Sequence, residues 1–164
     1  MPLLRPASSH IRGEPPPTPA PAPIVMTRQV LCRIMCTVGA FPAETGGILL
    51  GPVGSEDITG FFFDSGATCS GATYSPDHVT LARKLKDDWL PYGIDFKGFV
   101  HSHPGRLDRL SAGDLRYIRR LLQVNTDMDR FLAPLVIPHQ RRLCPIVVPR
   151  NRPDFPQPTV LRLI

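Results

Sequence analysis

The sequence has 164 residues, of which 42% are hydrophobic and 20% are charged, and its formal net charge is +5. This is enough for one ordinary domain with a core of its own, and the small basic excess does not require a nucleic-acid partner. No apolar run approaches the roughly 20 residues of a membrane span, the N-terminus lacks a signal-peptide core, and four scattered cysteines are too few for a secreted disulfide scaffold. We therefore expect a cytoplasmic protein without nucleic-acid or membrane partners.

The first 23 residues are rich in proline, with eight prolines that include the run EPPPTPAPAP. Proline has no N–H to donate and a fixed φ, so such a run avoids helix and sheet interiors. We predict a disordered tail over residues 1–23, either inert or a ligand for a proline-binding groove. The folded domain is then expected over residues 24–164.

The rest of the chain is predicted to alternate helices and strands. Helical spacing of apolar residues, or runs between turn residues, predict these elements in chain order: a helix over 27–38, a strand over 46–51 antiparallel to one over 57–63, a loop over 64–76, a helix over 77–90, a strand over 95–103, a helix over 111–124, and strands over 131–137, 143–149 and 158–164. Leu115, Ile118, Leu121 and Leu122 are predicted to face the core. The pattern indicates an α/β or α+β layered domain, with helices beside a mostly β core.

The stretch FVHSHP places two histidines one residue apart at the end of a predicted strand. Side chains alternate along a strand, so His101 and His103 are expected on one face, and Pro104 ends the strand there. Two imidazoles at this spacing suit a divalent metal. A third ligand is available in Asp114, near the start of the next predicted helix. Two histidines, a carboxylate and a water make a four-coordinate zinc site of the catalytic type.

Each of these residues also has a simpler interpretation. Two histidines in this pattern are often ordinary surface or capping residues. Ser111 and Asp114 form an S-x-x-D sequence at the head of an apolar-periodic segment, which is typical of a helix N-cap. The capping role does not exclude the metal role, because a helix start can aim a carboxylate at a metal.

The spacing of the whole set carries more information than any single residue. Seven residues, the first of them Pro104, separate His103 from Ser111, and two more separate Ser111 from Asp114. With Glu44 upstream in ETGGILLG, this pattern resembles the JAMM motif of the JAB/MPN family. That family comprises zinc metalloproteases that cut isopeptide or peptide bonds after ubiquitin-like proteins.

The resemblance covers about residues 27–148 and implies a JAB/MPN-like fold of the cytidine-deaminase-like type, a mixed β-sheet flanked by helices. It implies that His101, His103 and Asp114 hold Zn²⁺, which activates a water. Glu44 would be the general base, although it could otherwise be an exposed acid at a turn. Ser111 would donate a hydrogen bond to the developing oxyanion.

Three further residues are predicted on the substrate-binding side of the site. Gly46 and Gly47 lack side chains and would let a substrate backbone approach closely. Ser102 is expected to hydrogen-bond locally and orient the site. A glycine-ended tail could then lie between these glycines and the loop over 64–76, adding a strand to an exposed sheet edge.

These expectations lead to three functional hypotheses. The first is an isopeptidase or processing peptidase for a ubiquitin-like protein or its conjugate. The sequence resembles the stand-alone prokaryotic members of the family, some of which belong to antiviral conjugation systems. Activating and conjugating enzymes of the same operon are therefore candidate partners. The second is a JAB-type peptidase of phage tails, cell walls or sulfur carriers. The third is an inactive scaffold, but the complete set of motif residues argues against it.

Overall fold

The computed structural model describes residues 20–164, except 42–43, 71–72 and 106. Its central element is a mixed sheet of eight strands: β2 (Gly46–Pro52), β3 (Gly60–Phe63), β6 (Ile94–Ser102), β7 (Arg130–Leu132), β8 (Leu135–Ile137), β9 (Arg142–Cys144), β10 (Ile146–Pro149) and β11 (Gln157–Pro158). The order is β11-β10-β7-β6-β2-β3, with β8 also paired to β6 and β9 to β8. β6 is antiparallel to β2 and parallel to β7 and β8, so it lies inside the sheet.

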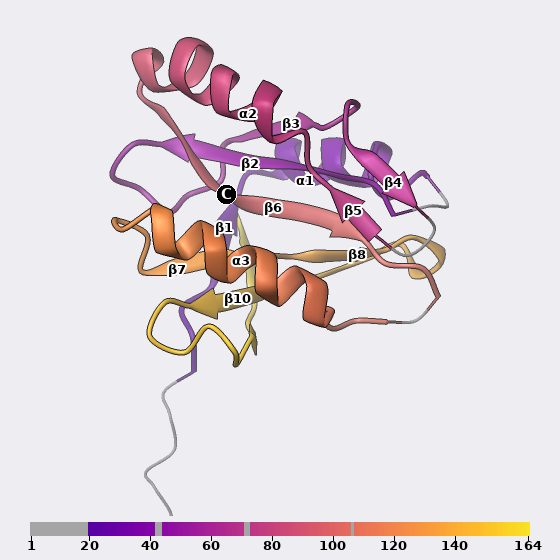
Figure 1. Ribbon diagram of the computed structural model, residues 1–164. Helices are drawn as coiled ribbons and strands as arrows, with labels where there is room; N and C mark the ends of the chain where they lie inside the picture. The colour runs from indigo at the N-terminus through magenta and orange to yellow at the C-terminus, as the bar shows by residue number, and fades with distance from the viewer. Residues whose placement is uncertain (1–19, 42–43, 71–72, 106) are drawn as a thin grey trace, which may run out of the picture.

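Three α-helices among the described residues cover the two faces of the sheet (Figure 1). α1 (Arg28–Cys36) lies on one face, and α2 (His78–Lys84) and α3 (Ala112–Val124) lie on the other. No helix in this part of the chain is long and apolar enough to cross a membrane. This arrangement confirms the predicted mixed sheet flanked by helices.

Short elements complete the described fold. α2 continues into a π-helical turn (Leu85–Trp89) and a 3-10 turn (Leu90–Tyr92), and a second 3-10 turn covers Pro138–Gln140. β1 (Ile24–Met26) pairs in parallel with β12 (Leu161–Leu163), and β4 (Thr68–Ser70) pairs with β5 (Thr73–Ser75) as a hairpin.

The alternation of side chains along the strands divides the core between the two faces of the sheet. In β2, Ile48 packs on the face covered by α2 and α3, whereas Leu49 packs on the face covered by α1. Phe99 and Val100 in β6 divide in the same way. Because His101 is two residues beyond Phe99, its side chain lies on the α2–α3 face.

The helices agree with the sequence prediction. α1 begins after Thr27, whose hydroxyl accepts a hydrogen bond from the Val30 N–H. The segment predicted over 77–90 is helical from His78, and it combines α2 with the π-helical turn and enters a 3-10 turn. The four leucine and isoleucine residues predicted to face inward from α3 all pack in the core on that face.

The predicted β segments required correction. Each of the last three predicted strands is divided into two, at Pro134, Pro145 and the residues around Thr159. Pro134 and Pro145 have no N–H for the ladder, which explains the first two interruptions. The last segment divides because β11 pairs with β10 whereas β12 pairs with β1. The loop predicted over 64–76 contains the β4–β5 hairpin, and β1 was not predicted.

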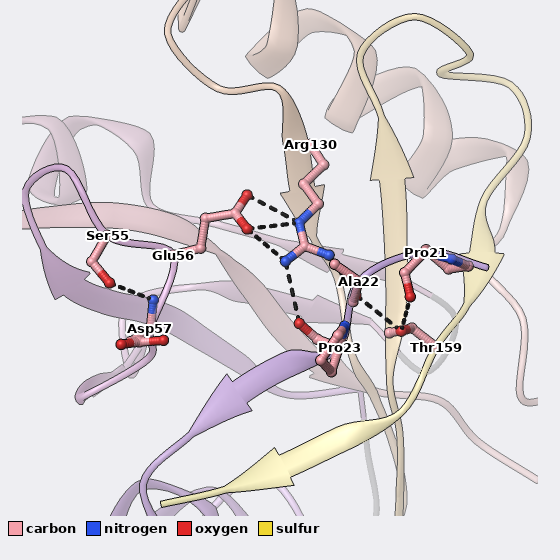
Figure 2. Close-up of polar contacts among 8 residues, drawn as sticks. All are labelled: Pro21, Ala22, Pro23, Ser55, Glu56, Asp57, Arg130 and Thr159. Carbon is pink, nitrogen blue, oxygen red and sulfur yellow. Dashed lines mark hydrogen bonds and ion pairs between the residues drawn. The ribbon is translucent and has the colours of Figure 1, made fainter. Parts of the chain in front are cut away.

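The predicted tail lies mostly outside the described residues, but its last residues contact the domain. The Arg130 guanidinium donates hydrogen bonds to the backbone oxygens of Ala22 and Pro23 and forms an ion pair with Glu56 at 2.6 Å. The Thr159 hydroxyl donates to the backbone oxygen of Pro21 at 3.1 Å. Figure 2 shows these contacts in the segment just before β1. The described end of the predicted tail thus contacts the domain, and the boundary predicted at residue 24 stays a prediction.

Candidate metal centre

The end of β6 and the start of α3 bring three predicted ligands together. The Nε2 atoms of His101 and His103 lie 2.9 Å apart. Asp114 Oδ1 is 3.3 Å from His101 Nε2, and Asp114 Oδ2 is 3.4 Å from His103 Nε2. One ligand atom from each residue lies within 4.8 Å of the others, so the three side chains could hold a metal ion.

The spacing of these atoms fits a small tetrahedral cation. Ligand atoms about 2.0–2.1 Å from zinc at tetrahedral angles lie roughly 3.3 Å from one another. The donor set of two imidazoles and one carboxylate is also a common zinc set. His101 and His103 are only 1% and 4% exposed, so a cation held there would be largely shielded from water.

Asp114 is positioned by the capping box of α3. Its backbone N–H donates to the Ser111 hydroxyl at 3.1 Å, and the Ser111 N–H donates to Asp114 Oδ2 at 2.7 Å. Burial alone would raise the pKa of Asp114, but hydrogen bonds from His101 and His103, the charge of His101 and a hydrogen bond from the Ser111 side chain hold that pKa well below its usual range. The carboxylate is therefore an anion aimed at the two imidazoles, and the capping and metal-ligand interpretations are compatible.

Ser111 is exposed and lines the same cavity as the ligands. Its hydroxyl oxygen accepts from the Asp114 N–H, and a hydroxyl group also has one proton that it can donate. The capping role predicted for Ser111 is confirmed. Donation to an oxyanion stays a prediction, and the position of the side chain at the cavity is compatible with it.

Glu44 lies before β2 and is 7% exposed, so it is not the exposed turn acid that the sequence left open. Burial raises its pKa above the ordinary value, while the nearby His103 and His101 oppose the change. The adjacent Thr45 is fixed by Ser102: the Thr45 N–H donates to the Ser102 hydroxyl at 3.1 Å, and the Ser102 N–H donates to the Thr45 carbonyl at 2.8 Å. Ser102 thus bonds locally and holds the chain beside Glu44.

The two glycines predicted on the substrate side are closely packed. A Cβ on Gly46 would lie 2.6 Å from the Tyr74 ring, and a Cβ on Gly47 would lie 2.5 Å from the Phe61 ring. In the structure, the missing side chains make room for aromatic rings of the protein. A substrate-binding role for Gly46, Gly47 and Ser102 stays a prediction.

A match to a family model shows which family this chain belongs to. The model of the family described as prokaryotic homologs of the JAB domain matches residues 30–151. The chain belongs to this family. No curated protein matches the sequence.

Two solved structures are similar to this chain. The solution structure of protein DSY2949 from Desulfitobacterium hafniense aligns over 86% of this chain and 92% of its own, with a TM-score of 0.65 and 18% identity. A JAB1/MPN domain protein from Archaeoglobus fulgidus, AF2198, aligns over 88% of this chain and 100% of its own, with a TM-score of 0.48 and 17% identity. The first likeness supports the fold of this JAB domain.

Two cavities of the JAB domain meet at one of the ligands. One cavity of about 160 Å³ is lined by Glu44, Tyr74, His103, Ser111 and Asp114, among others. A second, of about 400 Å³, is bounded by residues 39–41, 103–105 and 138–139. His103 lines both cavities.

An apolar groove continues from the first of these cavities. It has a volume of about 240 Å³ and lies between the π-extended α2 and α3, over the sheet. It shares four residues with the cavity beside the ligands: Pro76, His78, Phe99 and Tyr117. Leu81, Trp89 and Leu121 line its far part.

Sequence reasoning missed three residues of this JAB domain that surround the ligands. Tyr74 lies in the segment predicted as loop, and its ring stacks on the His101 imidazole. Asp64 accepts a hydrogen bond from the Tyr74 hydroxyl at 3.1 Å. The Tyr117 hydroxyl oxygen is hydrogen-bonded to His78 Nδ1 at 3.0 Å, and the Tyr117 ring packs on the Phe99 ring. No motif marks these residues, although an aromatic residue within a glycine- and serine-rich segment is a weak signal of packing.

Proposed function

We propose that this JAB domain is a zinc-dependent peptidase or isopeptidase that hydrolyses the amide bond following the C-terminal tail of a ubiquitin-like protein. The observation that carries the proposal is the convergence of His101, His103 and Asp114. Two of these ligands, His103 and Asp114, line one cavity together with the buried Glu44. The three ligands would hold zinc, which when bound supplies Lewis-acid activation of a water and of the scissile carbonyl.

The residues of the chain account for the proton transfers. Glu44 accepts a proton from the attacking water and delivers it to the nitrogen of the leaving amine, so that one water and one amide become a carboxylic acid and an amine. Its raised pKa suits this role, because a general base that must also act as an acid works best with a pKa nearer neutrality. Ser111 donates its hydroxyl proton in a hydrogen bond to the carbonyl oxygen as negative charge develops.

The shape of the site supports a polypeptide substrate. The two cavities that meet at His103 give room for a polypeptide chain beside the ligands. The apolar groove between α2 and α3 could hold an apolar side chain of the tail. The hairpin β4–β5 beside the cavity offers a strand edge to which an extended tail could be added.

The cellular setting is part of the proposal and rests on the family resemblance alone. A conjugation substrate would place the protein in the cytoplasm, with activating and conjugating enzymes of the same operon as partners. An antiviral role for such a system belongs to the same inference. It predicts that a glycine-ended β-grasp protein is encoded beside this chain.

Zinc analysis and a cleavage assay test the proposal. We expect about one zinc per chain in protein purified without chelator or His-tag, and none in His103→Ala. Ubiquitin-like proteins joined through their terminal glycine to a peptide, or to a lysine side chain, should be cut by the wild type and not by Glu44→Gln. Zinc-loaded wild-type protein that cuts no member of such a panel would contradict the proposed substrate class.

A further inference from the structure

We propose that Tyr74 and Asp64 act as positioning residues that hold the His101 imidazole with its Nε2 directed at Asp114. We call this pair the tyrosine latch. The inference rests on the proposed metal function, but it concerns residues that neither the motif nor the family match assigns. It makes the β4–β5 hairpin, which carries Tyr74, part of the metal centre.

The first contact of the tyrosine latch is a parallel ring stack. The centroids of the Tyr74 and His101 rings lie 5.8 Å apart, with an interplanar angle of 16°. Tyr74 is 8% exposed, so the ring is packed rather than free in solvent. Gly46 is the β2 residue paired with His101, and a Cβ on it would overlap the Tyr74 ring. The backbone of β2 thus leaves the space that lets Tyr74 lie against His101.

The second contact fixes Tyr74 from its other end. Its hydroxyl donates to Asp64 Oδ2 at 3.1 Å, and Asp64 is 6% exposed. The same carboxylate oxygen accepts from the Asp77 N–H at 3.1 Å, while the Asp64 N–H donates to the Gly46 carbonyl at 3.1 Å. Asp64 therefore joins the end of β3, the start of α2 and the strand beside His101.

His101 needs such a restraint because the usual one is missing. A metal-binding histidine normally donates from its second ring nitrogen to a carboxylate or carbonyl, which fixes the ring orientation. His101 Nδ1 is buried and has no hydrogen-bond partner among the described residues. The rings around it are those of Tyr74, Phe99 and His103. Of these, only Tyr74 stacks nearly parallel to the imidazole and is itself held by a buried carboxylate.

Zinc affinity measured by competition with a chromophoric chelator tests the tyrosine latch. Tyr74→Leu removes the stack, and we expect about a 10- to 100-fold weaker zinc affinity, as is typical when the support of a ligand is lost. Tyr74→Phe and Asp64→Asn keep the ring and weaken only its anchor, so smaller losses are expected. Tyr117→Leu is the matched control, because Tyr117 lines the same cavity as Tyr74 without stacking on His101. The zinc affinity of this variant should differ from that of the wild type by less than about threefold.

Two further measurements separate positioning from simple destabilisation. The visible spectrum of the Co²⁺-loaded protein reports ligand geometry, and we expect it to change in Tyr74→Leu and not in Tyr117→Leu. In metal-free protein, the His101 ring-proton NMR signals should be single and sharp in the wild type and shifted or multiple in Tyr74→Leu. If Tyr74→Leu does not fold, the same measurements are made on Tyr74→Phe, which preserves the ring.

The outcomes distinguish this inference from the proposed function. Equal zinc affinity and equal Co²⁺ spectra in wild type and Tyr74→Leu would overturn the tyrosine latch and leave the metal function standing. A wild type that binds no zinc would end the proposed function. In that case, unchanged His101 ring signals in Tyr74→Leu would overturn the latch as well, whereas a loss of the single sharp signals would support it as a structural restraint.

Discussion

His101 Nε2 lies 3.3 Å from Asp114 Oδ1, although the two residues come from different elements on either side of a loop. His101 is near the end of a strand inside the sheet, and Asp114 is in the first turn of α3. Both positions are fixed by backbone hydrogen bonds, so the distance between the imidazole and the carboxylate follows from the packing of α3 on the sheet. This relationship makes the ligand set a property of the tertiary fold.

Zinc should stabilise the folded protein through this ligand set. A free zinc concentration about 100-fold above the dissociation constant adds about 2.7 kcal/mol to the free energy of unfolding, which corresponds to roughly 5–10 °C in Tm. Thermal unfolding with and without zinc measures the effect. Asp114→Asn and His103→Ala should show little or no shift, and an equal shift in these variants would place the zinc elsewhere.

Replacing Glu44 should separate metal binding from catalysis. Glu44→Gln keeps the size of the side chain but cannot accept the proton from water, so hydrolysis should fall by at least about 10²-fold. Zinc content should be unchanged, because Glu44 is not among the three converging ligands. Turnover of a cleavable fusion, together with metal analysis of the same sample, checks both expectations. A variant that retains most of the activity would remove Glu44 from the proposed mechanism.

Ser111 is expected to contribute to stability and to rate in separable amounts. Ser111→Ala removes the N-cap acceptor, at a cost of about 1 kcal/mol in the free energy of unfolding. It also removes the proposed oxyanion donor, at a cost of about 10²–10³ in rate. Ser111→Thr retains both the cap and the hydroxyl and should be close to wild type. If the hydrolysis rate of Ser111→Ala falls only in proportion to the amount of folded protein, Ser111 has only the capping role.

Gly46→Ala should disturb the site through packing. The added Cβ would lie 2.6 Å from the Tyr74 ring, so the ring must move away from its position over His101. We expect a loss of about 1–3 kcal/mol in the free energy of unfolding, as for other overpacked sites, together with weaker zinc binding. Gly113→Ala is the comparison: its Cβ would lie 3.4 Å from the Ser111 Oγ and 4.0 Å from an Arg116 guanidinium nitrogen, and alanine favours the helix. Urea unfolding of both variants gives the two stabilities.

Tyr117 should make stability sensitive to alkaline pH. Burial, with a smaller contribution from the charge of Asp64, raises the pKa of Tyr117 to about 12. The folded state therefore favours the neutral phenol, and this contribution is complete below the unfolded pKa of about 10 and is lost as pH rises towards 12. The loss should be about 1 kcal/mol, because the ring is only partly buried. Urea unfolding at pH 9 and pH 11.5 should show a smaller decrease in Tyr117→Phe than in the wild type; an equal decrease would assign the effect to other groups.

Local sequence features were sufficient to predict several parts of the structure. Alternation in FVHSHP placed His101 and His103 on one face, and the S-x-x-D sequence located the start of α3 and its capping box. Apolar spacing identified the residues of α3 that face the core. These features depend on neighbours a few positions apart, which is the range over which helix period, strand period and capping act.

Other features depended on contacts between distant parts of the chain. The division of the C-terminal segments into separate strands, and the pairing of β1 with β12, required knowledge of which strand lies beside which. The burial of Glu44 and the position of Tyr74 against His101 are also features of the tertiary packing. Strand alternation and helix capping are local, so the order of residues is enough to identify the candidate metal ligands. The spacing of the ligands and the side chains that support them follow from the packing of α3 and the β4–β5 hairpin against the sheet, which local patterns do not reveal.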